Sequence, residues 1–193
     1  MSVGMTCTHT KVEKFSMRIV SVADKKFRIA IPQSEIKRRV AILADDINRD
    51  YAGQELVVVA VLNGSFMFVA DLIRKIKVPC RVSFVKTSSY EKDTSSGEVR
   101  QLIGLAEDIA GRHVLVVEDI IETGSTMRFI LNYLKKFSPA DIRLASLIVK
   151  LQAFDSMFHV DYVGFEKEDR FVVGYGLDYD GYGRNLEDIY EAI

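Results

Sequence analysis

The feature that most constrains the fold of this chain is a repeated order of apolar strand, short polar turn and amphipathic helix. Segment 56–62 reads LVVVAVL, a continuous apolar run typical of strands that are covered on both faces in a parallel sheet. Asn-Gly-Ser ends this run at 63–65, and Pro79 ends the helical pattern that follows it. The residues that recur at helical spacing between them are Phe66, Val69, Ala70 and Ile73.

The same order returns in the second half of the chain. A strand-like run at 113–117 leads through a turn to a helical pattern, and 142–149 reads as the next strand. The residues predicted to share one face of that helix are Met127, Ile130, Leu131 and Leu134. Earlier in the chain, Ser34 is a suitable N-cap for a helix that reaches Tyr51, and 82–85 begins another extended segment. The alternation predicts an α/β fold with an open, mostly parallel twisted sheet and helices on both faces.

Length and composition indicate one domain spanning 1–193. The hydrophobic content of 48% is sufficient for a full core, and no linker divides the chain. A net charge of −1 supplies no basic field for nucleic acid or for an anionic membrane surface. The two cysteines, Cys7 and Cys80, lack metal-ligand spacing and are too few for a disulfide framework. No run approaches the roughly 18 apolar residues of a membrane span, so we expect a cytoplasmic protein.

Two polar stretches interrupt the regular order. Segment 88–98, SSYEKDTSSGE, has no periodicity, and the tail after Phe171 is rich in glycine, tyrosine and aspartate. A loop as long as 88–98 inside a compact domain indicates either disorder or a mobile lid over a site. The residues alone leave these two alternatives open.

The turn Leu62-Asn63-Gly64-Ser65 has the outline of an anion site. In parallel α/β sheets, ligands bind beyond the carboxyl ends of the strands, where each turn leads into a helix. Glycine allows close approach of the backbone, and the helix N-terminus supplies unpaired N–H groups. The ordinary structural alternative is a strand-to-helix turn with Ser65 as N-cap.

A second turn, Glu122-Thr123-Gly124-Ser125-Thr126, combines hydroxyls and backbone N–H groups at the start of another helix, which suits a phosphate monoester. The nucleoside-triphosphate pattern G-x-x-x-x-G-K-[ST] is absent. Neither glycine pair of the tail completes G-x-G-x-x-G, because Tyr179 and Leu186 occupy the position of the third glycine. The sequence therefore favours a sugar phosphate over a dinucleotide.

The acid pair Glu118-Asp119 lies just before this turn, where carboxylates would repel a phosphate unless they bind another part of the same ligand. Sugar hydroxyls are the natural candidate, bound either directly or through Mg²⁺, which prefers oxygen ligands. The pattern predicts a site for ribose 5-phosphate. The alternative is that both acids are solvated residues at the end of a strand.

The segment VLVVEDIIETGST resembles the phosphoribosyl-pyrophosphate signature of type I phosphoribosyltransferases, and the motifs between Ile36 and Leu186 resemble their 6-oxopurine branch, the hypoxanthine(-guanine) phosphoribosyltransferases. The resemblance implies a purine salvage enzyme that transfers ribose 5-phosphate from 5-phosphoribosyl-1-pyrophosphate to N9 of hypoxanthine, and of guanine, with Mg²⁺. The products would be the nucleotides IMP or GMP, together with pyrophosphate. It also implies a small hood over the purine, formed from about 150–193, and a homodimer or homotetramer.

The resemblance also implies a role for each matching residue. Ribose and phosphate would be bound by Glu118, Asp119, Thr123, Gly124, Ser125 and Thr126. Pyrophosphate would be bound by Leu62, Asn63 and Gly64, across a non-proline cis peptide bond, and by Arg184. The purine end would comprise Lys150 at the 6-oxo group, Phe171 stacking on the ring, the backbone of Val172, and Asp178. Glu118, Asp119 and Asp178 would serve the metal, and Ser89-Tyr90 would belong to a mobile loop that closes over the site.

The purine residues also have a chemical rationale of their own. An aromatic face binds a flat heterocycle, and a lysine favours an acceptor oxygen over the amine of adenine. The ordinary alternatives are that Phe171 belongs to the core and that Lys150 is a solvated residue at a strand end.

One residue departs from the family pattern, in which an aspartate (EDIIDTG) acts as general base. Here the position holds Glu122, and the two carboxylates have similar reference pKa values, so only the position of the carboxylate oxygens differs. We expect Glu122 to be the general base. The departure leaves open a non-catalytic sensor of the sugar pyrophosphate or of a purine nucleotide on the same fold. A third alternative, a transferase for pyrimidines or adenine, is opposed by Lys150, Phe171 and Val172.

Overall fold

The computed structural model describes residues 19–89, 99–150 and 158–193. Tyr90 and the remainder of the predicted mobile loop through residue 98 lie outside the described residues, and Ser89 is described only as the last residue of a strand.

The larger of two sheets has six strands in the order β5-β4-β3-β6-β7-β8. Five of them are parallel, and only the edge strand β5 runs antiparallel, against β4. The strands are β3 (Leu56–Leu62), β4 (Cys80–Ser89), β5 (Val99–Ile103), β6 (His113–Ile121), β7 (Asp141–Lys150) and β8 (Tyr162–Lys167). This arrangement confirms the predicted open, mostly parallel α/β sheet.

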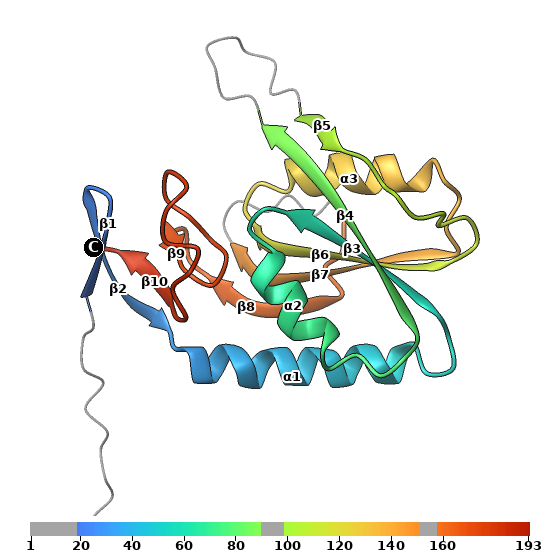
Figure 1. Ribbon diagram of the computed structural model, residues 1–193, viewed down its shortest axis with the longest axis horizontal. Helices are drawn as coiled ribbons and strands as arrows, with labels where there is room; N and C mark the ends of the chain where they lie inside the picture. Colours follow the sequence, from blue (N-terminus) through green and yellow to red (C-terminus); the bar gives the residue numbers. More distant parts are fainter. Residues whose placement is uncertain (1–18, 90–98, 151–157) are drawn as a thin grey trace, which may run out of the picture.

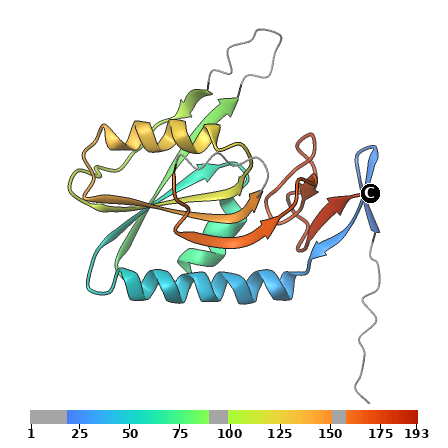
Figure 2. The same ribbon diagram turned by 180° about the vertical axis from the view of Figure 1, so that it is seen from behind.

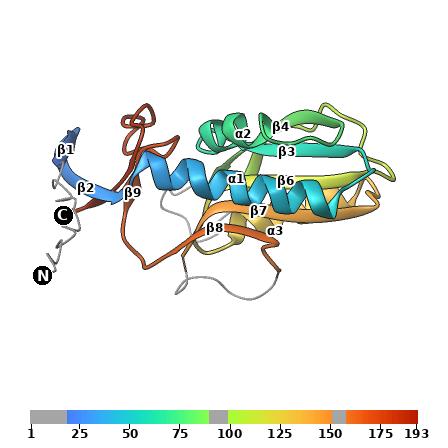
Figure 3. The same ribbon diagram turned by 90° about the horizontal axis from the view of Figure 1, so that it is seen from below.

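Helices cover both faces of this sheet, as the sequence predicts (Figure 1). The helices are α1 (Gln33–Asp50), α2 (Phe66–Ile73) and α3 (Ser125–Lys135). Strand β3 shows why the sequence reads as a continuous apolar run: Val58 and Ala60 pack with α1 and α2, whereas Val57 and Val59 pack with α3. Alternate side chains of a strand point to opposite faces, so both sets are buried. Figure 3 shows α1 lying along one face of the sheet.

Two details of the helices differ from the sequence predictions. Helix α1 begins two residues before the predicted start, with Pro32 at the N-cap, and Pro32 O accepts hydrogen bonds from the backbone N–H groups of Glu35 and Ile36. Ser34 is therefore inside the first turn rather than at the cap. In α2 the buried side chains are Phe68, Val69 and Leu72, whereas Phe66 is 39% exposed. The eight-residue sequence FMFVADLI is apolar on most sides, so its periodicity does not distinguish the buried face.

A second, antiparallel sheet combines the two ends of the described chain in the order β1-β2-β10-β9. Its strands are β1 (Ile19–Val22), β2 (Lys25–Ile31), β9 (Val172–Val173) and β10 (Ile189–Ala192). The resemblance implies a hood from about 150–193 alone, and neither β1 nor β2 is predicted from the sequence. Figures 1 and 2 show this sheet beyond the side on which the parallel strands end. No helix in the described part of the chain is long and apolar enough to cross a membrane.

Candidate active site

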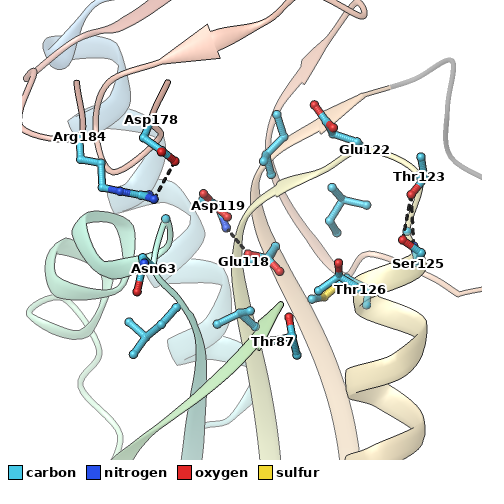
Figure 4. A pocket seen from close by; sticks show the side chains of 17 residues that line it. Asn63, Thr87, Glu118, Asp119, Glu122, Thr123, Ser125, Thr126, Asp178 and Arg184 are labelled. Atoms are coloured by element: carbon cyan, nitrogen blue, oxygen red, sulfur yellow. Dashed lines mark hydrogen bonds and ion pairs between the residues drawn. The ribbon is translucent and has the colours of Figure 1, made fainter. Parts of the chain in front are cut away.

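A pocket of about 410 Å³ lies at the carboxyl ends of β3 and β6 (Figure 4). Twelve of its seventeen lining residues were predicted from the sequence: Leu62, Asn63, Gly64, Glu118, Asp119, Glu122, Thr123, Gly124, Ser125, Thr126, Asp178 and Arg184. The structure also places Thr87, near the end of β4, in the lining. Sequence reasoning missed Thr87, although the ends of neighbouring parallel strands meet at one edge of a sheet.

The β3–α2 turn contains a cis peptide bond between Leu62 and Asn63, as the family resemblance implies. Ser65 occupies the N-cap of α2, but its hydroxyl donates to Val61 O instead of capping the helix. Gly64 lies against strand β6: a Cβ at Gly64 would be 1.5 Å from Asp119 Oδ2. The absence of a side chain here allows the turn and the Asp119 carboxylate to border the same space.

The β6–α3 turn has the features of a phosphate site. Gly124 is the N-cap of α3 and adopts φ 77°, a conformation that glycine tolerates without steric cost. The Thr123 and Ser125 hydroxyl oxygens lie 3.1 Å apart at the mouth of the helix. The first amides of an α-helix have no partner within the helix, and the N-terminus carries the positive end of the dipole. Hydroxyl and amide donors therefore converge on one side of the pocket.

Glu118 is a buried acid, with 6% of its surface exposed. Burial, followed by the neighbouring charge of Asp119, raises the pKa of Glu118 well above its usual range. The backbone N–H of Asp119 donates to Glu118 Oε1 at 3.1 Å, which orients the buried carboxyl group. Glu118 is thus not the solvated residue of the alternative interpretation. Buried acids need partners, and this one borders the pocket.

The tail after β9 delivers two charged side chains to the opposite wall. Arg184 Nη2 lies 2.7 Å from Asp178 Oδ1, and Arg184 Nη1 donates to Gly176 O at 2.7 Å. The other Asp178 oxygen accepts from the backbone N–H of Gly181 at 2.7 Å. Both side chains are held before any ligand binds, as Figure 4 shows for the ion pair. The predicted anion-binding and metal-binding residues of the tail therefore face the predicted phosphate turns.

Lys150 lies outside the pocket lining but contacts one of its residues. Its ammonium group forms ion pairs with Glu122 and, at 2.9 Å, with Asp169, while only 6% of its side chain is exposed. Burial opposes the charge on Lys150, but the hydrogen bonds to Glu122 and Asp169 outweigh it and raise the pKa of Lys150. The lysine is therefore a protonated donor, not the solvated strand end of the alternative interpretation.

Phe171 and Val172 do not line the pocket. Val172 is buried in β9, whereas 44% of Phe171 is exposed. The Phe171 ring packs edge-on against Tyr179, with centroids 5.7 Å apart, and Lys25 Nζ lies 5.7 Å from the Phe171 centroid. Phe171 and Val172 thus lie in a second area, which we call the base-binding area. The chain connects it to the pocket through Asp169, which pairs with Lys150, and Lys150 pairs with Glu122 of the pocket lining. Sequence reasoning missed Tyr179, Lys25 and Asp169, for which it offered no local signal.

The pocket offers oxygen ligands for a cation. Within the described ranges, no group of three or more His, Cys, Asp or Glu side chains is arranged to hold a metal ion. Glu118, Asp119 and Asp178 nevertheless line one pocket. Mg²⁺ is usually bound by one or two carboxylates together with substrate oxygens and water, so this donor set fits Mg²⁺.

Comparison with known proteins agrees with this geometry. Residues 32–180 match the phosphoribosyl transferase domain family. The chain is similar to the hypoxanthine-guanine phosphoribosyltransferase of Aquifex aeolicus, with 41% identity over 88% of this chain and 96% of the relative.

Two solved structures are also similar to this chain. One is a hypoxanthine-guanine phosphoribosyltransferase from Bacillus anthracis with HEPES in its active site (TM-score 0.81, 38% identity, 86% of this chain and 96% of the other). The other is a hypoxanthine phosphoribosyltransferase of Trypanosoma cruzi, described for the role of its C-terminal region in oligomeric state and activity (TM-score 0.81, 36% identity, 90% and 95%).

Proposed function

This chain belongs to the phosphoribosyl transferase family, and from that premise we propose how its residues divide the reaction among them. The activity is that of purine salvage: transfer of the phosphoribosyl group of 5-phosphoribosyl-1-pyrophosphate to a 6-oxopurine, as in the relatives named above. The observation that carries the assignment of roles is the pocket itself, in which the buried acid Glu118 and its half-buried neighbour Asp119 adjoin a helix N-terminus lined with hydroxyls.

In this proposal the β6–α3 turn holds the 5-phosphate. The hydroxyls of Thr123, Ser125 and Thr126 and the first amides of α3 donate to the phosphate oxygens. Glu118 and Asp119 accept hydrogen bonds from the ribose hydroxyls, which gives the buried Glu118 carboxyl group a polar partner. The sugar is thereby oriented with its anomeric carbon toward the opposite wall.

The pyrophosphate lies against the turn Leu62-Asn63-Gly64, whose backbone N–H groups donate to it, and against the guanidinium of Arg184. Asp178, with Glu118 and Asp119, supplies the oxygen ligands for Mg²⁺. When bound, Mg²⁺ would neutralise the charge that develops on the leaving pyrophosphate. Arg184 is fixed by two hydrogen bonds before binding, so it needs little reorganisation.

The base is recognised beside this pocket. Lys150 donates to the 6-oxo group, Phe171 stacks on the ring, and the backbone of Val172 contacts the base edge. Support comes from the raised pKa of Lys150, which favours its role as a hydrogen-bond donor, and from the 44% exposure of Phe171. The Glu122 carboxylate accepts the proton of the imidazole ring as N9 bonds to the anomeric carbon and the bond to pyrophosphate breaks.

The proposal extends to hypoxanthine and guanine as substrates, with IMP and GMP as products. It includes a cytoplasmic location and a homodimer or homotetramer without nucleic-acid or membrane partners. The tail after β9 also contributes to the proposed site, because Asp178 lines the pocket. The loop that contains Ser89 and Tyr90 would close over the reacting groups and exclude water.

The test is an assay with purified protein, Mg²⁺, the sugar pyrophosphate and hypoxanthine, guanine or xanthine, with nucleotide formation as the readout. Glu122→Gln removes the general base and should lower kcat by about 10²- to 10⁴-fold, whereas Glu122→Asp should retain most activity. The matched control is Glu166→Gln, an exposed residue on β8. Full activity of Glu122→Gln would refute the general-base role. Binding of the sugar pyrophosphate without nucleotide formation from any base would favour the sensor alternative.

A further inference from the structure

Glu191, in β10, is a buried acid outside the pocket, with only 10% of its side chain exposed. Its carboxylate is surrounded by cations. Arg28 donates to Glu191 Oε1 from both Nε and Nη2, at 2.9 and 2.6 Å. Arg170 Nη1 lies 3.4 Å from the same oxygen, and Lys167 Nζ lies 3.5 Å from Oε2.

These contacts keep the acid charged. Burial opposes ionisation of Glu191, but the hydrogen bonds from Arg28 and the charges of Lys167 and Arg170 outweigh it and lower the pKa of Glu191. Removing one partner of a buried ion pair leaves the remaining charge without compensation, which is strongly destabilising. Such a cluster therefore holds together the segments that contribute its charges. The proposed chemistry of the pocket makes no use of this acid.

The cations belong to segments that flank the proposed base-binding area. Arg28 lies on β2, Lys167 ends β8, and Arg170 immediately precedes Phe171. The backbone supports the same junction, because the N–H of Ala192 donates to Phe171 O at 3.0 Å and Glu191 pairs with Val172. Glu191 therefore fixes both ends of the short connection from β8 to β9.

That connection also carries Asp169, which binds Lys150. Lys150 in turn pairs with Glu122 in the pocket lining. The position of the 168–171 segment thus determines both where the Phe171 ring lies and where the Lys150 ammonium is held. A displacement of this segment would change base recognition while leaving the phosphate turns in place.

We propose that Glu191 is a positioning residue for the purine base, which acts through Arg28, Lys167 and Arg170 on the segment that presents Phe171 and Asp169. The inference rests on the proposed function, in which Phe171 and Lys150 contact the base. It predicts a selective effect on the base, since none of these three cations lines the phosphate pocket.

The experiment measures KM for hypoxanthine, KM for the sugar pyrophosphate and kcat in the full-length protein. Glu191→Gln should raise KM for hypoxanthine about tenfold, as expected for the loss of charge-assisted hydrogen bonds, with KM for the sugar pyrophosphate unchanged. Arg28→Gln should produce the same selective change, and the double variant should add little to it, because both remove one interaction. Glu191→Asp should rescue part of the loss. Glu166→Gln, the exposed control, should leave all three constants unchanged.

The variant Phe171→Ala distinguishes the positioning role of Glu191 from the proposed function on which it rests, in which Phe171 contacts the purine. If Phe171→Ala raises KM for hypoxanthine but Glu191→Gln and Arg28→Gln do not, the positioning role of Glu191 is refuted and the proposed role of Phe171 in base binding is supported. If Phe171→Ala leaves KM for hypoxanthine unchanged, both the proposed role of Phe171 in base binding and the positioning role of Glu191 are refuted. Parallel changes in both KM values for Glu191→Gln would refute the inference and indicate a general loss of structure. If Glu191→Gln does not fold, Arg28→Gln gives the decisive result, since 44% of the Arg28 side chain is exposed.

Discussion

Gly64 is the residue at which the β3–α2 turn meets strand β6 and the tail that follows β9. Its backbone lies against the Asp119 carboxylate, and Gly176 lies against its carbonyl oxygen, where a Cβ would be 2.1 Å away. Glycine at both positions lets three segments meet without side chains between them. Close tertiary contact, as well as local turn geometry, therefore requires glycine at these two positions.

Gly64→Ala should disturb the site more than the fold. A Cβ at this position would overlap the Asp119 carboxylate, which must move away from the ribose. Misplacement by about 1 Å can cost on the order of a hundredfold in rate, so kcat/KM for the sugar pyrophosphate should fall by up to that factor. Gly53→Ala is the control. No atom lies within 4 Å of a Cβ there, so the strain of alanine at φ 77° should lower the free energy of unfolding but leave kcat/KM unchanged. Steady-state kinetics with unchanged kcat/KM for Gly64→Ala would contradict the expected overlap.

At the scale of elements, the tail between β9 and β10 is held against α2. Three consecutive residues have positive φ: Gly174 at 100°, Tyr175 at 50° and Gly176 at 101°. The chain therefore turns sharply at this point. The Tyr175 hydroxyl donates to Asp71 of α2 at 2.8 Å, and burial together with this bond raises the pKa of Tyr175. This contact fixes the start of the tail that carries Asp178 and Arg184.

Tyr175→Phe removes that contact and retains the ring. The free energy of unfolding should decrease by about 1 to 3 kcal/mol, the usual cost of leaving a charged partner without its hydrogen bond. KM for the sugar pyrophosphate should rise because Arg184 is less well placed, while KM for hypoxanthine should change less. Denaturant unfolding and steady-state kinetics provide the two measurements. Tyr182→Phe, with 65% of Tyr182 exposed, is the control, and an equal effect of both variants would be evidence against the Asp71 anchor.

At the scale of the whole molecule, the small sheet is joined to the main sheet both by apolar packing and by polar contacts. Ile31, Val172 and Ile189 of the small sheet belong to the same buried core as α1 and the main sheet. Asp188 accepts from the backbone N–H of Gln33 at 2.7 Å, which connects the tail to the start of α1. Glu191 connects β10 to the end of β8 through Lys167. The base-binding area therefore depends on how the two sheets are held together, and part of that connection is ionic.

This ionic connection should weaken in acid. The pKa of Glu191 is lowered in the folded protein, so its contribution to stability is complete above the unfolded value of about 4.3 and is lost as pH falls through the folded pKa. The difference in Tm between the unsubstituted protein and Glu191→Gln should be largest near neutral pH and should narrow below about pH 4. Calorimetry across this range measures it, with Glu166→Gln as the control. A Tm difference that does not vary with pH would show that the charge of Glu191 is not the cause.

Much of the main sheet and the phosphate half of the pocket could be predicted from the sequence, because their signals are local. Continuous apolar runs indicate β3 and β6, and the glycine-containing turns after them lie at the carboxyl ends of strands, where parallel topology brings them together. The acids Glu118 and Asp119 were predicted for the same reason. The uniformly apolar α2 was the exception, since its pattern favours no single face.

Only the tertiary structure decided which distant segments meet. The strands β1, β2, β9 and β10 carry little periodicity, and their sheet is completed by the pairing of β2 with β10, which lie at opposite ends of the described chain. The ion pair of Glu122 with Lys150 and the burial of Glu191 among Arg28, Lys167 and Arg170 have no counterpart in local spacing. The sequence by itself determined much of the main sheet, the two turns at its edge and the donor chemistry of the proposed phosphate site. The base end depends on charge pairing between segments far apart in the chain, which exists only once both sheets have formed.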